Sequence, residues 1–498
     1  MYLVVIGILS LVLAFSGPPF RLVMQTGWIM ASVAAATLAP AAVAVLITRR
    51  ALRLLDSSPA DPSIGQYSFG RGMTIVRIVL GVLHGALLCT TNWMRLCTQT
   101  PVVGDWLAAP GMLAIVPFLI SVMLVWTATY PADRAMREIA LETYLFRGRP
   151  VRPATTMLRY LMFNMRHQVL FILAPMLLIL AARDLVARYG DQIRAATGQA
   201  VMPDMLLGLA AVAVAVVAPV LLRRIWVTEP LPAGPLRDRL SHLCVKLKMR
   251  CREILVWYSG GMLINAAVMG VVAPFRYFLI TDGMLEQMED RHVEAVFGHE
   301  AGHVKQHHIL FFLLFAFVSA CAVTALSYRG REMNRLTYQI AIVVAAGLLA
   351  LKWGVLFGWI SRCFERQADV YSVRTLAADG LPCQTPCVLH QPADNEKPVD
   401  KAAEGHVLCR SAAHLFGDTL GQVAALNGIP TQARSWRHGS IASRTRTVLA
   451  YSMDPMKTMR FERRVSRIKI GIVVAVVVSG LSAAWSLKLW TLLGIGGD

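Results

Sequence analysis

The sequence predicts a mainly α-helical protein that crosses a membrane several times and carries one extramembrane α+β domain. Of its 498 residues, 56% are hydrophobic and 16% are charged, and the mean hydropathy is +0.54. Soluble proteins of ordinary composition are less apolar than this. The apolar residues gather in long runs, whereas two segments after residue 230 are much more polar. The fold class is therefore a multi-pass membrane protein whose polar domain is interrupted by a transmembrane hairpin.

Nine apolar runs are long enough, or nearly long enough, to cross a bilayer as helices of about 20 residues. They span residues 2–15, 27–48, 73–90, 106–126, 168–186, 205–222, 309–327, 340–360 and 470–493. The first and fifth are short and the third contains Arg77 and His84, so a count of seven or eight is an open alternative. Residues 2–15 lack the basic start and the cleavage site of a secretory signal, and we expect a retained anchor there.

Lysine and arginine gather in alternate loops of this predicted arrangement. The formal net charge is +19, and the loops at 49–71, 134–166 and 223–252 are strongly basic, whereas the turn at 91–105 carries only Arg95. Basic loops stay in the cytoplasm, which places the amino terminus and the polar domain there, and we expect the cytoplasmic membrane of a bacterium. This explains the charge without nucleic acid, and no aromatic-basic repeat accompanies it.

The chain divides into five predicted segments. We expect a membrane region with about six spans over 1–230, a transmembrane hairpin over 309–360 and a last span over 468–498. Residues 231–308 and 361–467 would form the two parts of one cytoplasmic domain. The second part contains a polar run, QPADNEKPVDKAAEG, and we expect a flexible insertion at 380–410.

Three runs rich in β-branched and aromatic residues predict a small antiparallel sheet in the first part of the domain. They are EILVWYS at 253–259, MLINAAVMG at 262–270 and FRYFLIT at 275–281. Thr281 and Asp282 can cap a helix that begins near Met284. The spacing of apolar residues then predicts that 290–308 is helical.

The stretch FGHEAGHVKQHH at 297–308 contains the pattern H-E-x-x-H within that predicted helix. Residues four apart share a helix face, so His299 and His303 can hold one zinc ion with Glu300 beside them. Zinc lowers the pKa of a bound water, and Glu300 can accept the proton as that water attacks a peptide carbonyl. The alternative is a polar helix end at the membrane surface, which the complete pattern disfavours.

A catalytic zinc site needs a third protein ligand. A metzincin would have histidine at position 309, where this sequence has isoleucine. In SRCFERQAD, Glu365 and Asp369 share a helix face, and the two intervening spans return them to the side of the zinc helix. Glu365 can ligate zinc, and Asp369 can accept the free ring N–H of a ligand histidine. A solvated Glu-Arg pair is the alternative. We expect His307 and His308 to be interfacial residues.

These motifs resemble those of the membrane gluzincin metallopeptidases, the family that includes the CaaX prenyl protease and the HtpX protease. HEAGH resembles the zinc helix of that family and ERQAD its E-x-x-A-D element, with a membrane hairpin between them. The similarity extends from residue 252 to about 448. It implies a zincin-like α+β metallopeptidase domain with one zinc ion per chain.

The same resemblance implies roles for two further elements. NAAVMG resembles the N-A-x-V-x-G strand of the family, so Asn265, Ala266 and Val268 would lie beside the cleft and pair with an extended substrate. RHGSIASR resembles a histidine-proline element followed by an arginine, with glycine in the place of the proline. This implies that His438 and Arg444 stabilise the oxyanion.

Motifs and resemblance together predict an integral-membrane zinc endopeptidase. Its partners would be the lipid bilayer and polypeptide substrates that are membrane-associated or misfolded. A transporter or receptor with an incidental histidine cluster is one open alternative. A catalytically idle scaffold descended from a protease is the other, and the intact Glu300 argues against it.

Two further features fall outside this site. Cys383, Cys387 and His390 could bind a second metal, but their spacing is not that of a zinc knuckle, and the nine cysteines show no disulfide framework. Lys352 lies within a predicted span, where a charge is costly. It either has a function or faces a polar cavity or a neighbouring helix.

Overall fold

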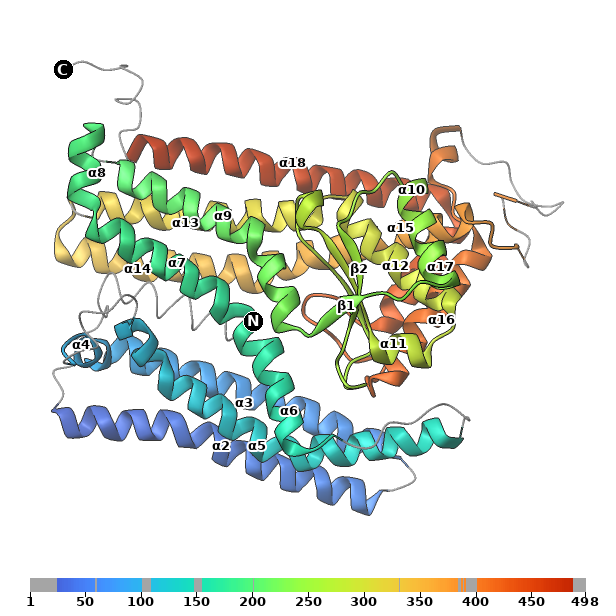
Figure 1. Ribbon diagram of the computed structural model, residues 1–498, viewed down its shortest axis with the longest axis horizontal. Coiled ribbons are helices and arrows are strands. Elements are labelled where there is room, and N and C mark those ends of the chain that lie inside the picture. Colours follow the sequence, from blue (N-terminus) through green and yellow to red (C-terminus); the bar gives the residue numbers. More distant parts are fainter. Residues whose placement is uncertain are drawn as a thin grey trace. The chain divides into compact units, whose positions relative to one another are not determined.

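The structure of the protein is a computed structural model (Figure 1). The chain divides into two units, Met1–Trp226 and Val227–Asp498. The described residues are 25–58, 61–100, 109–146, 155–199, 201–330, 332–383, 387, 389–390 and 401–486. The predicted anchor at 2–15 lies outside them, as do residues 391–400 of the predicted insertion and the end of the last predicted span.

The described part of the amino-terminal unit consists mainly of long apolar helices, with three shorter ones between them. They are α2 (Thr26–Ser57), α3 (Ser63–Thr90), α4 (Trp93–Thr98), α5 (Ala109–Phe146), α6 (Met157–Asn164), α7 (Phe171–Arg188), α8 (Gly190–Thr197) and α9 (Met202–Ile225), with a π-helical turn η1 (Met165–Leu170). Helix α2 packs against α3 and α5, and α7 packs against α9. Large apolar side chains such as Leu38, Val82 and Leu209 are more than half exposed. Such an apolar outer surface fits contact with lipid.

Eight helical stretches among the described residues are long and apolar enough to cross a membrane. Each overlaps one of the predicted spans from 27–48 onward, including the two weaker runs at 73–90 and 168–186. Five lie in the amino-terminal unit and three in the carboxy-terminal unit. The prediction of an integral membrane protein with several helical spans is thus supported.

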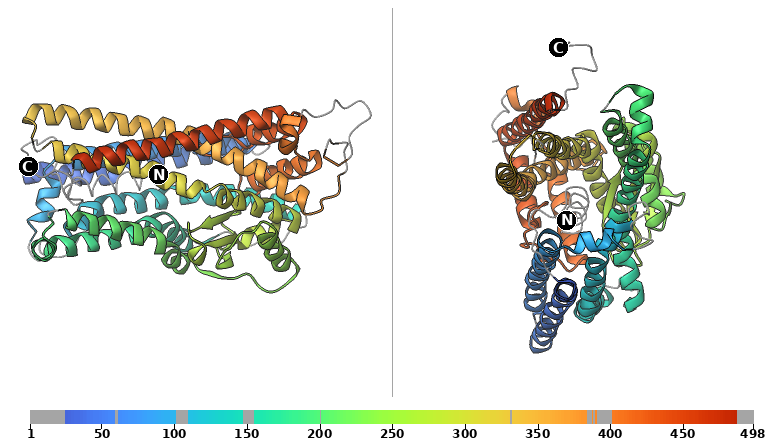
Figure 2. Two further views of the ribbon diagram at one scale, coloured as in Figure 1. Left: turned by 90° about the horizontal axis from the view of Figure 1, so that it is seen from above. Right: turned by 90° about the vertical axis from the view of Figure 1, so that its left-hand side faces the viewer.

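The carboxy-terminal unit combines a small sheet with helices of two kinds, short and membrane-length. The strands are β1 (Thr228–Pro230), β2 (Glu253–Trp257), β3 (Ala266–Met269) and β4 (Tyr277–Thr281). The helices are α10 (Pro235–Lys246), α11 (Asp282–Gln287), α12 (Asp290–Lys305), α13 (His308–Arg329), α14 (Arg335–Leu351), α15 (Phe357–Ala378), α16 (Arg410–Leu426), α17 (Ile441–Met453) and α18 (Pro455–Ser486), with short turns η2 (Ala273–Phe275), η3 (Lys352–Leu356) and η4 (Lys401–His406). Helix α13 lies beside α14 and α18 (Figure 2).

The sheet has the strand order β1-β2-β4-β3 and is mixed. Strands β2, β3 and β4 fall within the three predicted runs, and β1 was not predicted. The prediction of an all-antiparallel sheet is wrong for one pair, because β2 and β4 are parallel. Every residue of β4 is buried, which suits a central strand, whereas β3 is only partly buried and forms the edge. The burial of β4 therefore explains why it lies between β2 and β3.

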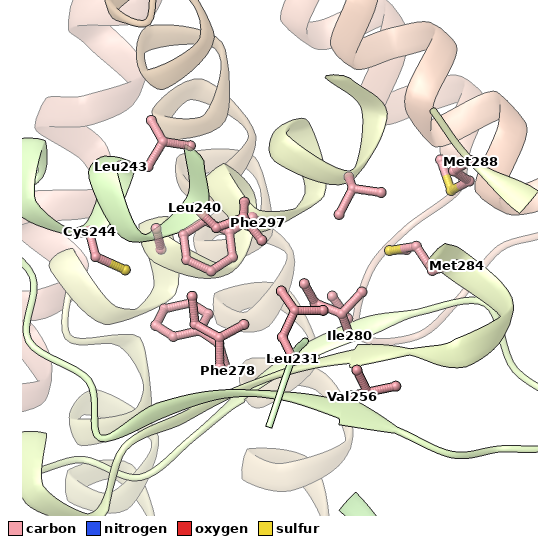
Figure 3. Packing of buried hydrophobic residues seen from close by; sticks show 14 of the residues in the cluster. Leu231, Leu240, Leu243, Cys244, Val256, Phe278, Ile280, Met284, Met288 and Phe297 are labelled. Atoms are coloured by element: carbon pink, nitrogen blue, oxygen red, sulfur yellow. The ribbon is translucent and has the colours of Figure 1, made fainter. Parts of the chain in front are cut away.

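One face of the sheet packs under the helix that carries H-E-x-x-H. Val256 of β2 and the pair Phe278 and Ile280 of β4 belong to a buried cluster with Leu240 of α10 and Phe297 of α12 (Figure 3). The rings of Phe278 and Phe297 are 4.5 Å apart between centroids. This core fixes the height and rotation of α12 above the sheet.

The expected helix over 290–308 is two helices. Helix α12 ends at Lys305, and His307 adopts a left-handed backbone with φ of 57° before α13 begins at His308. The expected cap at Thr281 is present, since its side chain accepts the N–H of Met284. The turn at His307 redirects the chain from the sheet into the membrane-length helix.

The structure also describes the surroundings of Lys352 and part of the segment 380–410. Lys352 donates to the carbonyl of Phe315 and to the hydroxyl of Ser319, both at 2.6 Å, so it faces the neighbouring helix α13. The insertion at 380–410, which we expect to be flexible, is described only in part. It contains the turn η4, and Cys387 and Cys409 are buried in it.

Candidate metal centre and active site

Helices α12 and α15 approach each other closely and carry most of the site. Gly298 and Gly302 face α15 at the contact. A Cβ atom added at Gly302 would lie 3.0 Å from Ala368 Cα and from Tyr371 Cβ, tighter than most real contacts. The two glycines thus allow the backbones to approach, and His299 and His303 come to lie opposite Glu365 and Asp369.

The predicted ligand atoms converge on one point. The Nε2 atoms of His299 and His303 are 3.2 Å apart. The carboxylate of Glu365 lies 3.6 Å from the first and 3.7 Å from the second. Two imidazole nitrogens and a carboxylate are a usual donor set for catalytic zinc, with a fourth position left for water or substrate. The residues present therefore fit a zinc ion.

Asp369 and Arg444 form a second layer behind His299. Asp369 Oδ1 is 2.9 Å from His299 Nδ1, which leaves Nε2 for a metal. Arg444 donates to both oxygens of Asp369, at 3.0 and 2.5 Å, and its Nη1 lies 3.6 Å from Glu365. Arg444 is buried, and in this structure its guanidinium orients carboxylates. Its predicted role at an oxyanion stays a prediction.

His303 has an equivalent partner that the sequence interpretation missed. His308 Nδ1 is 2.9 Å from His303 Nδ1, and His308 Nε2 is 3.0 Å from Gln367 Oε1. His308 is fully buried and stacks on Phe364, so the expectation that it is interfacial is wrong. The left-handed turn at His307, which is exposed, swings the next residue inward. The spacing of five residues from His303 gave no helical signal for this contact.

These contacts fix which ring nitrogen of His308 and of His303 carries a proton. Gln367 Oε1 can only accept, so Nε2 of His308 carries a proton and its Nδ1 accepts. Nδ1 of His303 must then be the donor, which leaves His303 Nε2 as a lone pair facing the ligand position. The hydrogen bonds that link Gln367 to His308 and His308 to His303 thus select the tautomer of His303 that can bind a metal.

Glu300 lies between the ligand set and the edge strand. Its Oε2 accepts the backbone N–H of Val268 in β3 at 3.1 Å. Burial, with the nearby carboxylate of Glu365, raises the pKa of Glu300 to about 7, against the opposing effect of His299. A carboxylate with a pKa near neutrality is suited to accept and return a proton.

The surroundings shift the pKa values of His299 and His303 in opposite directions. Burial lowers the pKa of His299, but hydrogen bonds to Asp369 and Glu365 outweigh it and raise the value to about 9. Burial and the neighbouring His299 lower the pKa of His303 to about 3. His303 is therefore neutral at physiological pH, as a metal ligand must be.

His438 lies at the solvent side of the site. Its Nδ1 is 2.9 Å from Glu365 Oε1, and 47% of its side chain is exposed. Gly439 has φ of 76°, which the proline ring does not allow, so glycine replaces the proline of the resembled element for a backbone reason. The short turn is closed by two backbone hydrogen bonds between Ser435 and Gly439.

Of the predicted substrate residues, Ala266 and Val268 lie on β3, at the edge of the described sheet, and Asn265 directly precedes this strand. Asn265 is tied inward, since its carbonyl accepts the N–H of Thr281. In an antiparallel pair alternate residues face the partner, so the backbone groups of Ala266 and Val268 point away from β4, where the N–H of Val268 is donated to Glu300. Of these three residues, Val268 contacts Glu300, and the roles of all three in substrate binding stay predictions.

Comparison with known proteins identifies the domain. Residues 230–420 match the model of peptidase family M48, and this segment includes the H-E-x-x-H pattern and Glu365. In structure, the chain is similar to the crystal structure of S. mikatae Ste24p, with a TM-score of 0.48 and 13% sequence identity over 85% of this chain and 99% of that chain. No curated protein matches the chain. Residues 230–420 therefore match a family M48 peptidase domain, which supports the resemblance to membrane metallopeptidases seen in the sequence.

Proposed function

We propose that the protein is an integral-membrane zinc endopeptidase that hydrolyses peptide bonds with Glu300 as the general base. The observation that carries this proposal is the convergence of three ligand atoms from His299, His303 and Glu365 within 4.8 Å, next to Glu300. The family M48 match supports the coarser statement, a membrane-associated metalloprotease. Zinc as the metal, Glu300 as the general base and the class of substrate are what we propose beyond this statement.

When bound, zinc would supply Lewis-acid chemistry by lowering the pKa of water and polarising a carbonyl. The protein residues supply geometry and proton transfer. His299 and His303 are each held by an outer partner, Asp369 for the first and His308 for the second. Because both rings are fixed from behind, little reorganisation is needed when the ligand set closes on a cation.

Glu300 would take a proton from water and later give it to the leaving amine. The N–H of Val268 holds one carboxylate oxygen, Oε2, and so orients the other. Since Val268 also belongs to the edge strand, a peptide pairing with β3 would be placed beside the same carboxylate. This arrangement couples substrate binding to the position of the base.

The substrate class follows from the edge strand and from the membrane-length helices. A strand edge recognises extended backbone and needs little side-chain selection. We therefore propose membrane-associated or misfolded polypeptides as substrates. The basic loops support a site that faces the cytoplasm of a bacterium.

The decisive experiment compares wild type with Glu300→Gln, using purified full-length protein and an unfolded, fluorescently labelled membrane polypeptide. Hydrolysis should fall by about 10² to 10⁴-fold, the usual contribution of a general base, while zinc content stays unchanged. Glu289→Gln is a matched control, because Glu289 is exposed at the start of the same helix. It should retain the wild-type rate.

Each other outcome contradicts the proposal in a different way. Equal rates in wild type and Glu300→Gln would exclude Glu300 as the base. A protein with neither zinc nor hydrolysis would favour a transporter or receptor. Zinc without hydrolysis in either form would favour an idle scaffold.

A further inference from the structure

Four potential metal ligands meet at a second place in the carboxy-terminal unit. They are Cys383, Cys387, His390 and Cys409, here called the thiol cluster, and their ligand atoms all lie within 4.8 Å of one another. Cys383 and Cys387 follow the end of α15, and Cys409 directly precedes α16. Cys409 is 22 residues from Cys387 in the chain, so folding rather than local sequence brings it to the others.

The distances suit one tetrahedral ion. A zinc ion with bonds of about 2.3 Å to sulfur holds neighbouring sulfurs roughly 3.8 Å apart. Cys383 Sγ lies 3.2 Å from Cys387 Sγ and 3.7 Å from Cys409 Sγ, and Cys387 Sγ lies 3.6 Å from His390 Nδ1. The shortest sulfur pair is still far longer than a disulfide bond of about 2.05 Å.

The burial of the cluster is that of a closed site. Cys387 and Cys409 are almost completely buried in a core with Val373 of α15 and Phe416 of α16. His390 is exposed and covers the solvent side. Buried cysteines often act only as small apolar side chains, but that role does not require three thiols and an imidazole to face one another.

We propose that the thiol cluster is a second zinc site with a structural role. Three thiolates and an imidazole are soft donors that select zinc over magnesium or calcium. Four protein ligands leave no open position for water, as in structural rather than catalytic sites. The ion would join the segment after α15 to the start of α16, and so brace the helix that presents Glu365. The chain would then hold two zinc ions, in place of the one predicted from the sequence.

The test measures zinc in the purified full-length protein by mass spectrometry. Wild type should hold two ions per chain, and His390→Ala should hold one. His390 is exposed, so this change should leave the fold intact, and His390→Cys should restore the second ion. The double variant His299→Ala/His303→Ala should also hold one ion, because it loses only the site on α12. Cys321→Ser, which removes a buried thiol of α13 outside the cluster, should keep two.

Cobalt substitution distinguishes the two sites independently of activity. Thiolate bound to Co²⁺ gives an intense near-ultraviolet charge-transfer band, and imidazole and carboxylate ligands do not. The band should persist in His299→Ala/His303→Ala and vanish in Cys409→Ser. One zinc in wild type without this band would overturn the proposal. So would a mass lower by two hydrogen atoms under non-reducing conditions, which would show a disulfide between Cys383 and Cys387.

Discussion

Gly302 of α12 faces Ala368 of α15 so closely that a Cβ atom at Gly302 would lie 3.0 Å from the Cα atom of Ala368. This contact sits between the two halves of the ligand set. His303 follows Gly302 directly, and Glu365 lies one turn before Ala368. The glycine in HEAGH is therefore part of the metal geometry, although it offers no ligand atom.

Replacing Gly302 by alanine should push the two helices apart. We expect Gly302→Ala to lower the free energy of unfolding by about 1–3 kcal/mol, the usual cost of overpacking, and to weaken zinc binding as well. Gly421→Ala in α16 is the control, since nothing lies within 4 Å of its added Cβ. Alanine there should stabilise by about 0.5–1 kcal/mol. Denaturant unfolding and chelator competition measure both effects, and equal behaviour of the two variants would contradict this view of the contact.

His308 should matter for zinc affinity even though it is not a ligand. Removing an outer partner of a ligand histidine usually lowers metal affinity by about 10 to 100-fold. We expect this loss for His308→Ala, because its Nδ1 holds His303 Nδ1 at 2.9 Å. His307→Ala changes the adjacent, exposed histidine and should leave the affinity unchanged. Zinc competition with a fluorescent chelator compares the two, and a larger loss in His307→Ala would reverse the assignment.

Local pattern was enough to predict that the candidate ligands His299, His303 and Glu365 lie together, but not what surrounds them. His299 and His303 share a helix face, and Glu365 and Asp369 share another, so four-residue spacing was informative. The partner of His303 depends on the turn at His307, and a left-handed residue there is not signalled by glycine or asparagine. The order of β3 and β4 depends on which strand is buried on both faces. The continuous apolar run YFLIT fits a fully buried central strand, whereas alternation fits a half-buried one.

The thiol cluster shows the same limit of prediction from local sequence pattern. Cys383, Cys387 and His390 are close in sequence, but three donors with this unusual spacing form a weak metal-binding pattern. The fourth donor, Cys409, lies across a polar run. Only its position at the start of α16 brings it within 3.7 Å of Cys383.

Glu365 and Asp369 should differ in their effect on the metal. Glu365→Ala removes one of three converging donor atoms, so zinc at this site should be lost. Asp369→Asn keeps a hydrogen-bond acceptor near His299 Nδ1 but removes its charge, and zinc affinity should fall by about 10 to 100-fold rather than disappear. Zinc analysis after dialysis against graded chelator separates the two results. Retention of this zinc in Glu365→Ala would exclude Glu365 as the third ligand.

Zinc binding at the α12 site should strengthen as the pH rises toward 9. Burial lowers the pKa of His299, but hydrogen bonds to Asp369 and Glu365 outweigh it and raise the pKa to about 9, above its ordinary value of 6.5. Zinc binds the neutral ring, so below pH 9 it must displace one proton, and its affinity should rise by up to about tenfold per pH unit. The same proton stabilises the metal-free fold below pH 6.5, and this stabilisation should be lost as the pH rises through 9.

Two background changes isolate this titration. Glu300→Gln removes the nearby carboxyl group, whose pKa is raised to about 7 by burial, and His390→Ala removes a ligand of the thiol cluster. In this background, calorimetry in buffers of different ionisation enthalpy should find about one proton released per zinc at pH 7.5. Adding Asp369→Asn removes the charged hydrogen-bond partner that raises the pKa of His299, so the rise in affinity should end at a lower pH. If affinity is flat between pH 7 and 9, or is unchanged by Asp369→Asn, the proton on His299 is not held by these carboxylates.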